Sequence, residues 1–129
     1  MKKSELLAIT LVILSTVGTV LGIFAIENYR KKKLFTLELI ARAPEHGNWY
    51  PRKIKIPYGE KEVKILIRNI ETVTHGFAIP DLGVAVKEIK AGEVKVVQFT
   101  PNKKGIFPFM CTVWCSEEHL HMTGELIVE

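Results

Sequence analysis

Four side chains that can bind soft metal ions lie within twelve residues near the C-terminus: Cys111, Cys115, His119 and Met122. Both cysteines of the chain are in this segment. Thiolate and thioether sulfurs beside an imidazole favour copper over hard cations. One Cys, two His and a weak Met would describe a mononuclear copper site, so the second Cys indicates room for more than one metal ion. A second imidazole must then come from elsewhere, and we predict that it is His75.

The order of these residues is similar to the binuclear copper (CuA) motif of cytochrome c oxidase subunit II, which the copper domain of nitrous oxide reductase shares. That family reads His and then, after a gap, Cys-x-x-x-Cys-x-x-x-His-x-x-Met. His75, Cys111, Cys115, His119 and Met122 match it at the same spacings. Five ligand-type residues in register over two separated segments are a specific signal, whereas Cys-x-x-x-Cys by itself would be a weak one.

The resemblance extends over residues 49–129 and implies a centre of two copper ions. Cys111 and Cys115 would each bridge both ions as thiolates, so that one unpaired electron is shared by two metals. The nuclei would then move little between the oxidised and reduced states, and little reorganisation would oppose electron transfer. His75 and His119 would each bind one ion.

Two weaker ligands complete the implied set. Met122 would be an axial ligand of one copper, where a neutral thioether stabilises Cu(I). The backbone carbonyl of Val113 would contact the other copper, a role that any residue type permits. The remaining histidines are predicted to be non-ligands, because His46 has no motif around it and His121 would point away from the site on an extended backbone.

Simpler interpretations remain open for each of these residues. Cys111 and Cys115 could form a disulfide, which an extracytoplasmic location permits. His75 and His119 could be ordinary hydrogen-bonded histidines, and Met122 could be a core residue. A disulfide, however, would leave the two histidines and the methionine unexplained.

Aromatic and acidic residues surround the ligand segment. Trp114 lies within it, and Phe107 and Phe109 lie just before it. These rings could exclude water and form a docking patch for an electron donor, or they could be ordinary core residues. Glu117 and Glu118 could face a basic electron donor or could simply be solvated.

The resemblance to oxidase subunits is incomplete. Many of them have a Glu at the position of Val113 that joins a magnesium site, and an acidic residue at the position of Thr72. Their aromatic cluster for the electron donor is not evident here, although Trp49 and Tyr50 could serve. Two membrane helices are usual in that family, and this chain has one candidate. These differences fit the compact subunit II of B-type oxidases.

A long apolar segment precedes the region that resembles the copper domain. Leu6–Ile26 contains 21 residues without a charge, which as a helix would span about 31 Å, close to the thickness of a membrane's hydrocarbon core. A cleaved signal peptide is the alternative, but its apolar region is typically about 7–15 residues long. We therefore expect a membrane anchor with a basic juxtamembrane linker at residues 1–33, and one domain at residues 34–129.

The net charge of +4 is concentrated around the apolar segment. Residues 1–33 carry six basic and two acidic side chains, whereas residues 34–129 carry 12 of each. Basic flanks suit lipid headgroups, and a neutral domain does not predict nucleic-acid binding. More basic residues follow the segment than precede it, which favours a cytoplasmic domain. The resemblance implies the extracytoplasmic side instead, and we follow it because the charge asymmetry is small.

Short segments of strand character make up residues 34–129, separated by turns that contain Gly and Pro. Strands are expected at 34–40, 62–68, 84–89, 94–99, 106–110 and 125–128, and another begins at His75. No window carries a helical period. This pattern predicts an all-β sandwich or barrel. The resemblance implies a cupredoxin-like Greek-key β-sandwich, whose metal ligands converge at one end.

The resemblance also implies electron transfer rather than catalysis by this chain. It would be the electron-accepting subunit II of a haem-copper terminal oxidase, single-pass in the cell membrane with its copper domain on the periplasmic side. Its partners would be cytochrome c or a similar electron donor, the catalytic subunit I, and membrane lipid. The alternatives are a stand-alone membrane-anchored copper electron carrier, similar to the nitrous oxide reductase domain, and a copper metallochaperone.

Overall fold

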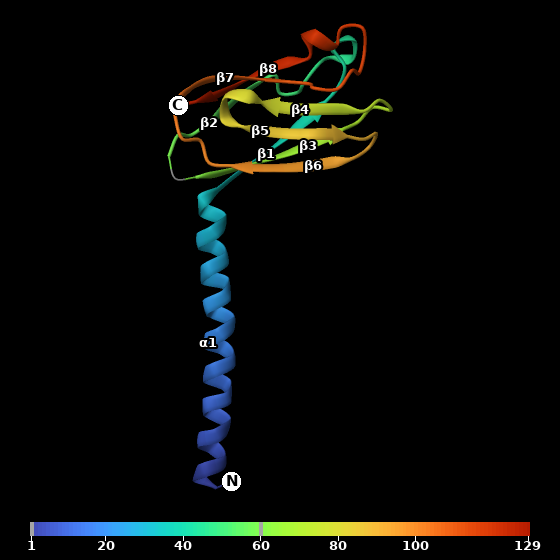
Figure 1. Ribbon diagram of the computed structural model, residues 1–129. Coiled ribbons are helices and arrows are strands. Elements are labelled where there is room, and N and C mark those ends of the chain that lie inside the picture. The colour runs from blue at the N-terminus through green and yellow to red at the C-terminus, as the bar shows by residue number, and fades with distance from the viewer. Residues whose placement is uncertain (1, 60) are drawn as a thin grey trace. The chain divides into compact units, whose positions relative to one another are not determined.

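The computed structural model describes residues 2–59 and 61–129 (Figure 1). The chain divides into two compact units, Met1–Lys33 and Leu34–Glu129. The first is helix α1 (Lys3–Lys33), so the residues expected as a basic linker continue the helix. The side chains of residues 31–33 lie outside the described part.

Helix α1 is apolar enough to cross a membrane over Lys3–Arg30, which confirms the predicted N-terminal apolar helix. Hydroxyl groups in the middle of the helix bond back to carbonyl oxygens of the preceding turn. Thr10 donates to Leu6, and Thr19 donates to Ser15. These bonds satisfy the polar groups within the helix, as a hydrocarbon environment requires.

The described part of the second unit contains eight strands and three short 3-10 helices. The strands are β1 (Leu34–Ala41), β2 (Lys53–Ile56), β3 (Glu62–Asn69), β4 (His75–Ile79), β5 (Val84–Ile89), β6 (Val94–Phe99), β7 (Gly105–Met110) and β8 (Thr123–Val128). The 3-10 helices are η1 (Pro44–His46), η2 (Pro80–Leu82) and η3 (His119–His121). All the predicted strand segments are present, and β2 is the strand that the sequence analysis did not identify.

The strands form two sheets that lie as two layers in Figure 1, and the all-β prediction is confirmed. One sheet has the order β1-β3-β6, and the other has the order β2-β8-β7-β4-β5. Strand β1 pairs with β3 in parallel, and β2 pairs with β8 in parallel, whereas the other ladders are antiparallel.

The core between the sheets follows the alternation of the strands. In β3, Val63, Ile65 and Ile67 are fully buried, as their spacing predicted. The same alternation ends on a polar residue, because Asn69 occupies the next buried position. A side chain with both a hydrogen-bond donor and an acceptor in that position indicates a structural role beyond packing.

Three aromatic rings pack against one another beneath the strands that carry the predicted ligands. Phe77 of β4 and Phe109 of β7 have ring centroids 5.7 Å apart, and Trp49 meets them edge-on at 5.6 and 5.9 Å. Phe107 is also buried. Of the two interpretations left open for Phe107 and Phe109, core packing is therefore the one that the structure supports. The cluster fixes β4 and β7 relative to each other two residues away from His75 in β4 and two residues away from Cys111 after β7.

Candidate metal centre

The predicted ligands come from two places in the fold. His75 is the first residue of β4, and the others lie in the segment that connects β7 with β8. Cys111 directly follows β7, and Met122 directly precedes β8. The amide of Cys111 donates to the carbonyl of Met122 at 3.0 Å, so the segment is closed where it leaves the sheet. Neighbouring strands thus hold both ends of the ligand segment.

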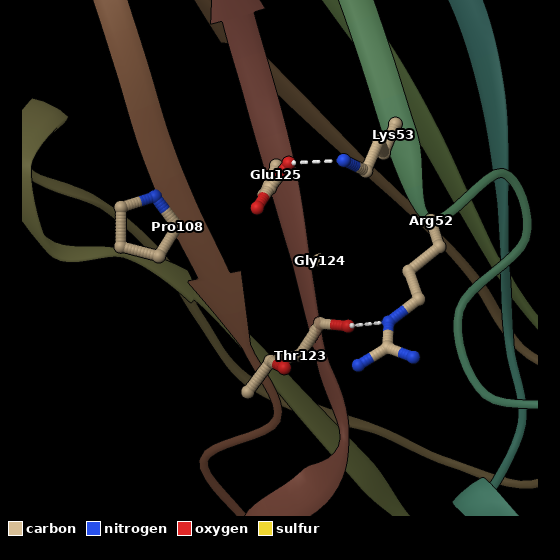
Figure 2. Close-up of a pocket in the computed structure, with 6 residues that line it drawn as sticks. All are labelled: Arg52, Lys53, Pro108, Thr123, Gly124 and Glu125. Atoms are coloured by element: carbon tan, nitrogen blue, oxygen red, sulfur yellow. Dashed lines mark hydrogen bonds and ion pairs between the residues drawn. The ribbon is translucent and has the colours of Figure 1, made fainter.

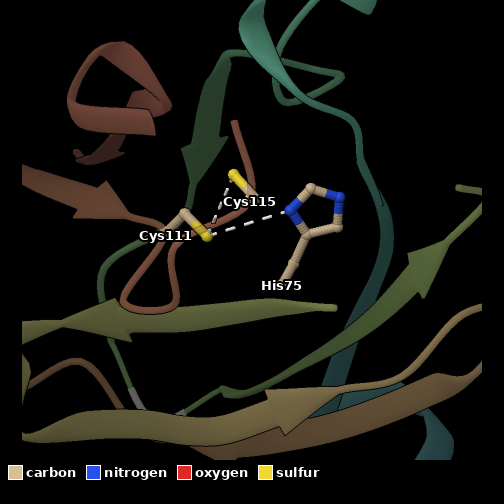
Figure 3. A group of neighbouring side chains, drawn as sticks. All are labelled: His75, Cys111 and Cys115. Carbon is tan, nitrogen blue, oxygen red and sulfur yellow. Dashed lines mark hydrogen bonds between the residues drawn. The ribbon is translucent and has the colours of Figure 1, made fainter. Parts of the chain in front are cut away.

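The sulfur atoms of Cys111 and Cys115 lie 3.9 Å apart, and both cysteines are free (Figure 3). A thiolate sulfur lies about 2.3 Å from a metal ion such as zinc, so two of them at a tetrahedral angle would be about 3.8 Å apart. The observed spacing therefore fits two sulfurs that share a metal ion.

Each thiol has an imidazole of its own. His75 Nδ1 lies 3.8 Å from the sulfur of Cys111, and His119 Nδ1 lies 3.6 Å from the sulfur of Cys115. A nitrogen and a sulfur bound to one ion at tetrahedral angles would be about 3.5 Å apart. Ligand atoms of His75 and the two cysteines all lie within 4.8 Å of one another. The arrangement has two similar halves, each of which pairs one thiol with one imidazole.

The two weaker predicted ligands lie beside the thiols. The Met122 sulfur is 3.6 Å from that of Cys115, and the Val113 carbonyl oxygen is 3.2 Å from the sulfur of Cys111. The structure thus brings all six predicted ligand residues together. His75 and Met122 are fully buried and Cys111 is nearly so, while Cys115 and His119 are half-buried. Soft, largely dry ligands of this kind suit copper.

Glu71 supports the centre, and the sequence analysis missed it. Its Oε2 accepts a hydrogen bond from His75 Nε2 at 2.8 Å and one from the Ala43 amide at 2.7 Å. Its Oε1 contacts His46 Nδ1. The bond to Nε2 fixes the ring of His75 so that Nδ1 faces the thiols, as carboxylates commonly do for metal-binding histidines. Oxidase subunits often have an acidic residue at the position of Thr72, and here the acidic residue lies one position earlier.

Buried Asn69 holds the turn that carries Glu71. Its amide nitrogen donates to the carbonyls of Val73 at 2.7 Å and Ile89 at 2.9 Å, and its Oδ1 accepts from the Glu71 amide at 2.9 Å. All three bonds use the polar atoms of one side chain inside the sandwich. In the sequence, the signal for this turn was a polar residue at a position of β3 where the alternation predicts a buried apolar one.

Gly76 allows strand β4 to approach the ligand segment closely. A Cβ atom there would lie 2.2 Å from Thr112 Oγ1 and 3.0 Å from Val113 Cγ2. The same approach brings the Gly76 amide within 3.4 Å of the Cys111 sulfur, where it donates a hydrogen bond. The chain therefore supplies a backbone hydrogen bond to one of the two predicted bridging sulfurs.

The loop between β1 and β2 clamps the other end of the ligand segment. Trp49 Nε1 donates to the Met122 carbonyl at 3.1 Å, and Asn48 Nδ2 donates to the His121 carbonyl at 2.8 Å. Trp49 is buried, so it does not offer the aromatic surface suggested for an electron donor, whereas Tyr50 is exposed. Trp49 instead connects the aromatic core to the backbone of a predicted ligand.

His121 is exposed, with its Nδ1 2.6 Å from Glu118 Oε2. The reason given for setting it aside was wrong, because the backbone there is the 3-10 helix η3 and not an extended strand. Glu118, which was expected to be solvated or to face an electron donor, is this histidine's surface partner.

The pKa values of the two thiols are shifted in opposite directions. Burial alone would raise the pKa of Cys111, but hydrogen bonds from His75 and Gly76 hold it below its usual value. Burial and the neighbouring Cys111 charge raise the pKa of Cys115 to about 12. Burial alone would lower the pKa of His75, yet its contacts with Cys111 and Glu71 raise it. Metal binding to both sulfurs must therefore displace the Cys115 proton, and higher pH favours it.

A separate hollow of about 490 Å³ lies along β2, β7 and β8, and no predicted ligand lines it (Figure 2). Arg52 Nε donates to the Thr123 carbonyl at 3.0 Å, and Lys53 Nζ pairs with Glu125 Oε2 at 3.0 Å. These cross-strand contacts tie β8 to β2 immediately after the ligand segment. We assign the hollow a structural role in holding β8.

We expect Glu71→Gln to lower the free energy of unfolding at neutral pH by about 1.5–3 kcal/mol, because hydrogen bonds to a charged group are lost. Burial alone would raise the pKa of Glu71, but its bonds with His46, Ala43 and His75 lower it from 4.5. This stabilisation is therefore present above pH 4.5 and is lost as the pH falls through the lower folded-state pKa.

Chemical unfolding of the metal-free chain at several pH values measures the effect. The native chain should lose stability on acidification, and the Gln variant should lose less. Glu118→Gln is the control, because Glu118 pairs with a histidine on the exposed surface, where such pairs contribute little. If the free energy of unfolding fell equally with pH in the native chain and in the Glu71 variant, the stabilising role assigned to the Glu71 carboxylate would be wrong.

The sequence profile of the family described as Cupredoxin-like domain matches residues 21–128. Nitrous-oxide reductase of Ralstonia nicotianae is 34% identical over 103 residues, which are 78% of this chain and 15% of the reductase. Cytochrome c oxidase subunit 2 of Thermus thermophilus is 28% identical over 81 residues, which are 63% of this chain and 58% of that subunit. The chain thus spans a small part of the reductase and somewhat more than half of the oxidase subunit.

Solved structures have the same fold. A chain from a heme-copper terminal oxidase dimer, determined by cryo-electron microscopy, superposes with a TM-score of 0.63 and 24% identity. The alignment covers 98% of this chain and 100% of that one. The periplasmic domain of cytochrome oxidase subunit II of Bradyrhizobium japonicum superposes with a TM-score of 0.62 and 19% identity, over 74% of this chain and 83% of that domain.

Proposed function

The chain belongs to the cupredoxin-like family, and on that basis we propose that it holds a binuclear copper centre and transfers electrons at a membrane. One observation carries the proposal: two free thiols lie 3.9 Å apart, and each has its own imidazole within 3.8 Å. A mononuclear site needs only one of these cysteines. The family implies copper, and the paired thiols support two ions.

The residues around the thiols would each have a distinct task. Cys111 and Cys115 would bridge the ions, and His75 and His119 would bind one ion each. Met122 and the Val113 carbonyl would complete the set. A bound pair of coppers would accept and give up one electron at a time. The core beneath β4 and β7 would keep the ligands in place during that change, which lowers the reorganisation that opposes transfer.

We propose further that the chain is subunit II of a haem-copper terminal oxidase. Its electron donor would be cytochrome c or a similar protein, and its acceptor would be haem in catalytic subunit I. The copper domain would lie on the extracytoplasmic side, with α1 as the anchor in the lipid. Similarity to the Thermus thermophilus subunit supports this assignment, as does an alignment that covers all of one oxidase chain.

A second candidate is a membrane-anchored copper electron carrier related to nitrous-oxide reductase. The higher identity to the Ralstonia nicotianae enzyme, 34% over 78% of this chain, favours it. Purification of the native complex from its membrane distinguishes the two functions, since only an oxidase subunit would co-purify with haem. A metallochaperone fits less well, because three of the predicted ligands are buried and transfer of copper requires accessible ones.

Electron paramagnetic resonance with copper quantitation tests the centre directly. We expect the detergent-solubilised chain to bind two coppers and, when oxidised by one electron, to show one unpaired electron shared by two nuclei. One copper with its spin on a single nucleus would refute the binuclear centre and leave a mononuclear cupredoxin.

An exposed apolar surface over His119 supports docking of an electron donor. The Trp114 side chain is 69% exposed, and its ring centroid lies 5.9 Å from that of the His119 imidazole. Leu120 is 81% exposed on the same segment. Exposed tryptophans are frequent binding hot spots. The docking interpretation therefore applies to Trp114, whereas Phe107 and Phe109 belong to the core.

We expect Trp114→Ala to lower the bimolecular rate of reduction by the electron donor about tenfold or more. The copper spectrum and copper content should not change, because Trp114 contributes no ligand atom. Stopped-flow reduction by cytochrome c measures the rate. Tyr58→Ala, which removes another exposed aromatic ring, should leave it unchanged. If both variants react at the native rate, Trp114 is not the docking residue.

A further inference from the structure

A hollow of about 220 Å³ lies beside one of the two predicted bridging cysteines. Glu45 and His46 line it from η1, Glu71 from the turn before β4, and Cys115 from the ligand segment. Cys115 is half-buried, whereas Cys111 and His75 are buried. The hollow therefore places charged and imidazole side chains next to the predicted bridging residue Cys115.

His46 is oriented as metal-binding histidines are. Its Nδ1 contacts Glu71 Oε1, and its side chain is 71% exposed. Within residues 2–59 and 61–129, no hydrogen bond involves its Nε2. A histidine that donates its Nδ1 proton to a carboxylate presents the Nε2 lone pair for coordination. Although no sequence motif surrounds it, His46 thus has the hydrogen bonding that is common for metal-binding histidines.

Glu71 joins this outer imidazole to the inner one. One carboxylate oxygen contacts His46 and the other accepts from His75 Nε2 at 2.8 Å. A hydrogen bond with its own backbone is the main cause that lowers the pKa of Glu45. Glu45 and Glu71 line the hollow together, and the negative charge of carboxylates around a hollow concentrates cations there.

We propose that His46 is an outer copper-binding site, which receives Cu(I) in this hollow and passes it to Cys115 while the centre is being loaded. The inference rests on the proposed copper function. In the transfer, the bond from copper to the His46 nitrogen breaks as the bond to the Cys115 sulfur forms. The thiol proton leaves to water, and copper remains Cu(I), so the step requires no oxidant or reductant.

Two substitutions of His46 separate metal binding from hydrogen bonding. His46→Gln retains an N–H donor for Glu71 but loses the imidazole ligand. His46→Met provides a thioether that binds Cu(I) but cannot donate to Glu71. His121→Gln is the matched control, because His121 is also exposed and paired with a glutamate but does not line the hollow.

Loading is measured by anaerobic stopped flow on the reduced full-length chain in detergent. Cu(I) is supplied as its weak acetonitrile complex, and the absorption of the copper–thiolate bond is followed. We expect His46→Gln to load about tenfold more slowly than the native chain, because the hollow keeps its charge but loses the imidazole nitrogen, and losing one group that supports a metal site typically costs about tenfold or more. His46→Met and the His121 control should load at close to the native rate.

Equal loading rates for the native chain and His46→Gln would overturn the proposal. Slow loading of His46→Met would also overturn it, because the effect would then belong to the hydrogen bond with Glu71. Copper content and the spin spectrum of each loaded chain, recorded after one-electron oxidation, test the binuclear centre independently. A single copper in the native chain would refute that centre, whereas the comparison of rates would still decide the role of His46.

Discussion

Cys115→Ser should reduce the copper content from two ions to one and remove the shared-spin signal. The remaining soft ligands would be one cysteine, two histidines and one methionine, which is the set of a mononuclear blue-copper site. A neutral serine hydroxyl is a poor replacement, since it is a hard oxygen that does not ionise at neutral pH. The second ion would therefore lose a bridging ligand that no neighbouring side chain replaces.

The expected spectrum distinguishes this result from simple unfolding. The Ser variant should still bind one copper through Cys111, with the unpaired electron on a single nucleus and intense thiolate charge-transfer absorption. Its rate of electron transfer to an acceptor should fall strongly, because one ion with an altered ligand set reorganises more. Glu117→Gln, an exposed change in the same segment, should retain two coppers. A Cys115→Ser chain that kept two coppers and a shared spin would refute the bridging role.

The raised pKa of Cys115 also supports the binding of a cation between the two sulfurs. Its value of about 12 comes from burial and from the adjacent Cys111 charge. Two thiolates 3.9 Å apart repel each other unless a cation lies between them. The second sulfur is therefore protonated at neutral pH in the metal-free protein. A thiol is protonated at that pH in the unfolded chain as well, so the raised pKa has no cost in stability there, and the metal-free Ser variant should fold about as well as the native chain.

The elements with local patterns were predictable from the sequence. The strand segments show alternation, and the helix α1 shows an uninterrupted apolar run. Strand β2 was missed although its four residues, Lys53–Ile56, alternate between lysine and isoleucine, because so short a run is weak evidence for a strand. Its pairing with β8 is parallel and joins residues far apart in the chain, and no local signal encodes that ladder.

The ligand residues were predictable because their spacing is a motif, but their supports were not. Trp49 reaches Met122 across 73 positions of sequence, and Ala43 reaches Glu71 across 28. Such contacts depend on which loops the sandwich brings to one end. The expectation of an extended backbone at His121 was wrong because three residues of sequence do not distinguish a 3-10 turn from a short extended segment.

Trp49 connects the core to the centre, and its replacement should affect both. Trp49→Ala should lower the free energy of unfolding by about 3–5 kcal/mol, the usual cost of removing a buried aromatic ring. It removes the edge-on contacts with Phe77 and Phe109 and the hydrogen bond to the Met122 carbonyl. Chemical unfolding of the metal-free chain, followed by near-ultraviolet circular dichroism, measures the loss.

Trp49→Phe separates the two contributions and remains informative if the Ala variant fails to fold. Phenylalanine keeps a ring in the cluster but loses the Nε1 hydrogen bond, so stability should fall by only about 0.5–1.5 kcal/mol. The Met122 carbonyl still accepts from the Cys111 amide, which limits the cost. Without the hydrogen bond from Trp49, the Met122 side chain should be held less firmly beside the copper. The reduction potential of the copper centre should then shift. A native potential in Trp49→Phe would show that the strands alone hold Met122, and that Trp49 acts only in the core.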